Sequence, residues 1–124
     1  EITLEASCLD SAIDDIREIR DEFWSDLRVD GSAADLNQSL EYAGRVADFL
    51  EFAELMCLDA IERDESCGCH LREEHQTDDG EAVRDDIGYS TVQVWEHTGD
   101  PAKPELYHEV LDFEVVEPVT RSYK

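Results

Sequence analysis

The sequence predicts a mainly α-helical fold, in which an antiparallel helical hairpin is followed by a C-terminal two-stranded β ribbon. Three observations lead to this expectation. Apolar residues recur every three or four positions between 9 and 61, and Asp30-Gly31 interrupts the pattern once. The periodicity ends near residue 70, and beyond 89 apolar and polar residues alternate, as they do in strands.

The first helix is predicted over residues 8–28. Its apolar stripe consists of Leu9, Ala12, Ile13, Ile16, Ile19, Phe23, Trp24 and Leu27. The opposite face is charged, so the helix is amphipathic. Ser7, followed three positions later by Asp10, offers a capping pair at the amino-terminal end.

The second helix is predicted over residues 33–64, with Ser32 and Asp35 as its capping pair. One apolar stripe comprises Leu36, Leu40, Ala43, Ala47, Leu50, Cys57 and Ile61. A neighbouring stripe comprises Val46, Phe49, Ala53, Met56 and Ala60. So wide an apolar face needs two partners, and the first helix supplies one.

We therefore expect an incomplete three-helix bundle. The third helix would come from upstream of Glu1 in a longer protein, or from a second copy of this chain. In the alternative interpretation, the second stripe packs on the C-terminal strands.

Three parts of the chain are expected. Residues 1–72 form the helical bundle part, and residues 73–88 form an exposed acidic connector. Residues 89–124 form the β ribbon and a C-terminal tail, with strands over 90–97 and 106–116. An isolated hairpin is only marginally stable in water, so the ribbon should lie against the helices or another domain.

The chain is strongly acidic, with 33 acidic and 10 basic residues and a net charge of -23. Such a field repels phosphate backbones and excludes nucleic acid as an expected partner. No apolar run approaches the ~20 residues of a membrane span, so a soluble piece is expected. The start at Glu1 favours an amino end cut from a longer protein. The four cysteines show no disulfide-framework spacing and favour a reducing cytoplasm.

Four candidate metal ligands or nucleophiles, Cys67, Cys69, His70 and His75, lie where the second helix must stop. The Cys-x-Cys spacing is narrower than that of zinc knuckles, and neighbours in sequence do not by themselves form an activated thiol. Gly68 is better explained as the residue of a helix-terminating turn.

No nucleotide-binding or hydrolase pattern is present, and the acidic run 78–81 lacks the alternating ligands of an EF-hand. We therefore assign no catalytic, cofactor-binding or metal-binding residue.

Several segments resemble the C-terminal end of succinate dehydrogenase and fumarate reductase flavoprotein subunits. These segments are residues 37–41, 44–51, 65–74 and 121–123. In the sharpest of them, six residues match a family pattern: Glu65, Ser66, Gly68, His70, Arg72 and Glu73. Cys67 and Cys69 stand where many members have Arg and Ala. A Cys at the position of Cys67 resembles the pattern of a subgroup that is associated with a single cytochrome b anchor subunit.

The resemblance implies a spectrin-repeat-like three-helix bundle followed by an extended tail. In such subunits other domains hold FAD and the catalytic Arg, so this chain alone is expected to be inactive and to contain no FAD. The implied partners are the flavin domain of the same subunit, the iron-sulfur subunit and, indirectly, a cytochrome b membrane anchor. The implied location is cytoplasmic, on the inner face of the cell membrane.

The resemblance also assigns Glu65, Ser66, His70 and Arg72 to an interface with these partners, while capping of the helix end is the local alternative. Arg72 presents a planar fork suited to carboxylates or carbonyl groups. Two other functions stay open. One is an independent acidic helical module that forms a homodimer through the second stripe, and the other is a small Cys/His metal-binding protein.

Overall fold

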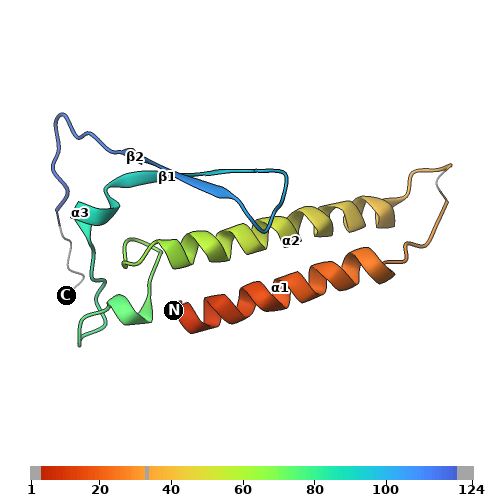
Figure 1. The fold of residues 1–124 in the computed structure, drawn as a ribbon, viewed down its shortest axis with the longest axis horizontal. Helices are drawn as coiled ribbons and strands as arrows, with labels where there is room; N and C mark the ends of the chain where they lie inside the picture. Colours follow the sequence, from red (N-terminus) through yellow and green to blue (C-terminus); the bar gives the residue numbers. More distant parts are fainter. Residues whose placement is uncertain (1–3, 33, 120–124) are drawn as a thin grey trace.

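The computed structural model describes residues 4–32 and 34–119. Its elements are α1 (Ala6–Asp26), α2 (Gln38–Glu62), the short 3-10 helix η1 (Glu73–His75), α3 (Asp86–Tyr89), β1 (Thr91–Glu96) and β2 (Glu105–Val110). Helices α1 and α2 form an antiparallel hairpin, and the β1–β2 ribbon runs along another side of α2 (Figure 1). The predicted fold class is confirmed. Residues 121–123, which contribute to the family resemblance, lie outside the described residues.

Helix α1 begins at Ala6, two residues before the predicted start, and Ser7 is not its cap. Ser7 lies inside the first turn, where its hydroxyl donates to Glu5 Oε1 at 2.8 Å. The N–H of Ala6 donates instead to Glu74 Oε1 at 2.7 Å, from a residue 68 positions away. The predicted Ser7–Asp10 pair was wrong because a tertiary carboxylate occupies this helix end.

Helix α2 begins at Gln38, after the predicted start at residue 33, which itself lies outside the described residues. Asn37 is the cap: its Oδ1 accepts from the N–H of Leu40 at 3.1 Å, and its Nδ2 donates to Asp30 O at 3.1 Å. Ser32 accepts a bond within the loop, from Ala34 N–H. The predicted Ser32–Asp35 pair was wrong because Asn37 both caps the helix and closes the loop.

The ribbon is antiparallel, and Val94 stands opposite Tyr107 near its centre. It is held to α2 by Trp95, whose indole N–H donates to Asp59 Oδ1 at 2.7 Å. Strand β2 ends at Val110, short of the predicted residue 116. The acidic connector is not free of structure, because η1, α3 and a bridge between Gln76 and Ala82 fold it beside the end of α2.

The apolar core of this chain is thin. Among the described residues, Leu9 and Ile13 of α1 are the apolar side chains that are buried. The accessible surface is 9433 Å², whereas a compact monomer of this mass exposes roughly 6,700 Å². The chain therefore leaves uncovered much of what a self-sufficient domain would bury.

One side of α2 accounts for much of this uncovered surface. We call it the open stripe and define it by Tyr42, Val46, Phe49, Ala53, Met56 and Ala60. The spacing alternates between four and three residues, which aligns side chains along one face. Phe49 is 65% exposed and Met56 is 57% exposed. The ribbon does not cover this face, so the alternative in which the second stripe packs on the strands was wrong.

Candidate functional site

The carboxyl-terminal end of α2 is closed by side chains from the segment that follows it. The last four carbonyls of a helix have no partner within the helix. Arg72 Nη1 donates to Ala60 O at 3.1 Å and to Ile61 O at 3.3 Å. The Tyr89 hydroxyl donates to Glu62 O at 3.1 Å, and His70 Nε2 bonds Arg63 O at 2.8 Å. Each of these four carbonyls thus receives a side-chain donor.

Arg72 is the central residue of this helix end, and only 3% of it is exposed. Besides the two carbonyls, its Nε donates to Glu74 Oε2 at 3.2 Å, and its Nη2 lies 3.5 Å from Asp64 Oδ1. The guanidinium fork is therefore fully used inside the chain, for carbonyls and carboxylates together.

Ser66 holds the backbone that presents Arg72. The Arg72 N–H donates to Ser66 Oγ at 2.8 Å, and Ser66 Oγ donates to Arg72 O at 3.1 Å. Between them, Cys67 and His70 close a tight turn with two backbone bonds. Gly68 has φ +62°, which a side chain would disfavour. The predicted left-handed conformation of Gly68 is confirmed, but its turn does not end the helix, because α2 ends at Glu62 with Arg63 as its C-cap.

Glu65 ties this helix end to α3. Its Oε2 accepts from the N–H of Asp85, the α3 cap, at 2.7 Å, and its Oε1 accepts from Arg63 Nη2 at 2.6 Å. Both carboxylate oxygens are paired, as a buried carboxylate requires.

The four residues predicted for an interface lie together in space. Glu65, Ser66 and Arg72 are buried in this chain, and His70 is half-buried. The structure shows their part in closing α2, and the interface assignment stays a prediction. Sequence reasoning missed the roles of Tyr89, which reaches the site from α3, and of Glu74 in η1, because no local pattern marks their contacts with the helix ends.

Glu74 links the two helices, because its carboxylate binds Ala6 N–H at the start of α1 and Arg72 at the end of α2. The Ala6 N–H bond first, and then the Arg72 bond, lower the pKa of Glu74 from 4.5 to about 2. Since the pKa is lower in the folded chain, this stabilisation is present above about pH 4.5 and is lost as the pH falls toward 2.

We expect Glu74→Gln to lower the melting temperature near pH 6 and to matter progressively less toward pH 2. Circular dichroism melts of both proteins between pH 2 and 6 measure this difference. Glu18→Gln, on an exposed residue of α1, is the control for general acid effects. A melting-temperature difference for Glu74→Gln that does not change over this range would contradict the role of the ionised carboxylate.

A second polar site lies between the helices, and the sequence did not reveal it. Glu54 of α2 is 0% exposed. Its Oε1 accepts from Arg17 Nε at 2.6 Å, and its Oε2 pairs with Arg20, so α1 contributes two guanidinium groups. A single Glu in a charged helix pattern gives no local sign of such burial.

The two histidines among the candidate metal ligands are used in other ways. His70 bonds the helix end, and His75 Nε2 bonds Asp64 Oδ1 at 2.7 Å. Within residues 4–32 and 34–119, no group of three or more His, Cys, Asp or Glu side chains converges as metal ligands do. The half-buried Cys57 thiol has a pKa raised by burial and then by Glu54, opposite to the shift of an activated thiol.

One cavity of this part of the chain lies between α2 and the ribbon and has a volume of about 260 Å³. In the described part of the chain, no helix is both long enough and apolar enough to cross a lipid bilayer.

The fold and the site define a helical hairpin domain with one apolar side open and a polar cluster that fixes the end of α2. A family model described as "Fumarate reductase flavoprotein C-term" matches residues 2–123. The chain therefore belongs to the C-terminal domain family of succinate dehydrogenase and fumarate reductase flavoproteins. No individual curated protein gives a match to the chain.

Proposed function

We propose that the chain is the structural C-terminal domain of the FAD-containing subunit of a succinate:quinone oxidoreductase. Family membership over residues 2–123 supports the parent enzyme. The open stripe carries the structural role, because an exposed apolar face of this kind marks an interaction surface.

In this proposal the domain supplies no catalytic group. The parent subunit interconverts succinate and fumarate by hydride transfer involving its flavin, and the flavin is held by another domain. The helix end built by Arg72, Ser66 and Glu65 keeps α2 straight and fixed up to its last turn. It thereby sets the position of the stripe that the rest of the enzyme covers.

The proposed partners of the stripe are the flavin domain and the iron-sulfur subunit. Helix α1 and the ribbon already occupy two sides of α2, so the third side is the one available (Figure 1). The complex would be attached through a cytochrome b anchor to the cytoplasmic face of the cell membrane. The isolated chain should then neither retain FAD nor oxidise succinate, and flavin absorbance co-purifying with it would contradict the proposal.

A charge placed on the open stripe should weaken assembly. We expect Phe49→Glu, made in the full-length flavoprotein subunit, to reduce co-purification of the iron-sulfur subunit or retention of FAD at least tenfold, because a carboxylate would be buried without a partner. Ile87→Glu is the control: Ile87 is 99% exposed and lies outside the stripe. Equal assembly of the two variants would contradict the proposal.

An independent module that dimerises through the open stripe is the second candidate, and the same exposed face favours it. Analytical ultracentrifugation separates the two. A tight dimer of the isolated chain that Phe49→Glu dissociates, together with a gene lacking any flavin-binding sequence upstream of Glu1, would favour the module. A glycine-rich flavin-binding sequence upstream would favour the oxidoreductase.

A further inference from the structure

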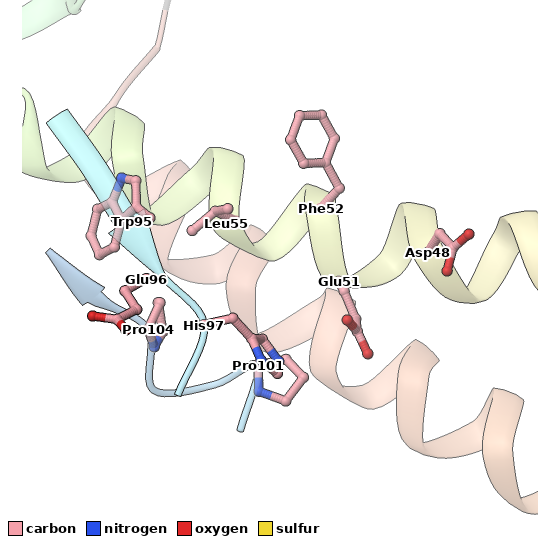
Figure 2. A pocket seen from close by; sticks show the side chains of 9 residues that line it. All are labelled: Asp48, Glu51, Phe52, Leu55, Trp95, Glu96, His97, Pro101 and Pro104. Carbon is pink, nitrogen blue, oxygen red and sulfur yellow. The ribbon is translucent and has the colours of Figure 1, made fainter. Parts of the chain in front are cut away.

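The cavity between α2 and the ribbon has a composition that neither the open stripe nor the helix end explains. It is lined by Asp48, Glu51, Phe52, Leu55, Trp95, Glu96, His97, Pro101 and Pro104 (Figure 2). From this arrangement we propose that the cavity receives an arginine side chain from a basic segment of a partner protein.

The volume of the cavity selects the size of its occupant. At about 260 Å³ it is too small for a cofactor and large enough for one long side chain. Trp95 is held in place by its bond to Asp59, and Leu55 lies beside it (Figure 2). Together with Pro101 and Pro104, Trp95 offers a rigid apolar wall for the aliphatic stem of an arginine.

The charge of the cavity selects a cation. Its lining contains three carboxylates, and among these described residues there is neither Lys nor Arg. Asp48 and Glu51 make no hydrogen bond or ion pair with the described part of the chain. Glu51 points from α2 toward His97 and Pro101 (Figure 2). The Gly99 N–H donates to His97 Nδ1 at 3.2 Å, which places the imidazole proton on Nε2.

The indole favours arginine over lysine. A planar guanidinium stacks on an aromatic face while its N–H groups bind carboxylates, whereas an ammonium group is more strongly hydrated. The acidic field of the whole chain, with its net charge of -23, would speed the approach of a basic segment. This site is separate from the open stripe, so it does not depend on which protein covers that stripe.

The two indole N–H signals in a proton–nitrogen correlation spectrum test the proposal, because the chain has two Trp residues. In a titration of the chain with N-acetyl-arginine amide at low salt, we expect the Trp95 signal to shift saturably and the Trp24 signal to stay in place. N-acetyl-citrulline amide, a neutral analogue of the same shape, should bind at least tenfold more weakly. The lysine analogue should bind with intermediate affinity.

Glu51→Gln should weaken arginine binding about two- to fivefold, the usual range for a solvent-accessible ion pair. Glu18→Gln, a matched change on an exposed residue of α1, should leave it unchanged. Three results would overturn the proposal: no saturable shift of the Trp95 signal, equal affinity for citrulline, or no effect of Glu51→Gln. This test does not involve assembly of the parent enzyme. Its result therefore decides the arginine proposal independently of the proposed function.

Discussion

Replacing Arg72 with Met should lower the free energy of unfolding by about 3 kcal/mol. Arg72 is 3% exposed and donates to the carbonyls of Ala60 and Ile61. Met fills a similar volume and donates nothing, so both carbonyls lose a partner in a covered site, and the exposed Glu74 carboxylate loses its ion pair. A buried acceptor without a partner costs about 1–3 kcal/mol, and charged groups cost more.

The control is Arg45→Met on the exposed side of α2, where Arg45 pairs with Glu41 one turn away. A surface pair of this kind contributes about 0.5 kcal/mol or less. Arg72→Lys should fall between the two, since an ammonium group keeps the charge and loses the fork. Urea unfolding measures all three, and a loss for Arg72→Met no larger than that for Arg45→Met would show that the helix end does not depend on this side chain.

Replacing Glu54 with Ala should also cost about 3 kcal/mol, for a different reason. The Glu54 carboxylate is fully covered and neutralises Arg17 and Arg20, which α1 brings to the helix interface. Without it, two guanidinium groups face each other beside a cavity. Arg17 is more exposed than Arg20, so Arg20 should account for most of the loss.

Two further variants make the result specific. Glu51→Ala, about one turn away on the same helix, exchanges an exposed carboxylate for the same side chain and should change stability by less than about 0.5 kcal/mol. A triple variant with Glu54→Leu, Arg17→Met and Arg20→Met should recover most of the loss, because apolar residues commonly replace a buried ion pair without destabilisation. Thermal melts of these variants check both expectations, and an equal loss for Glu51→Ala and Glu54→Ala would contradict the account.

Features set by local spacing were predictable from the sequence. The two amphipathic helices, the break near Gly31, the turn at Gly68 and the alternating ribbon each depend on residues close together in the chain. The second stripe of α2 was also predictable, because its apolar residues recur at helical spacing in the sequence whether or not a partner covers them.

Features set by distant contacts were not predictable in the same way. The first N–H of α1 is bound by Glu74, and the last carbonyls of α2 are bound by Arg72, Tyr89 and His70. The Ser-and-acid spacings at Ser7 and Ser32 were misleading because a tertiary carboxylate and Asn37 took those places. In the sequence, Glu54 has the same surroundings as an acidic residue on the surface. Only the structure shows that Arg17 and Arg20 of α1 pair with it.

The central claim is that the open stripe of α2 is a covered surface in the working protein. Met56 tests it most directly, because it is the one methionine of the chain and it lies on the stripe with 57% of its surface exposed. Hydroxyl-radical labelling followed by mass spectrometry should give fast oxidation of Met56 in the isolated chain and at least tenfold slower oxidation in the full flavoprotein with its iron-sulfur subunit. Oxidation of Met56 at the same rate in both would show that the stripe stays exposed to solvent, and it would contradict the account.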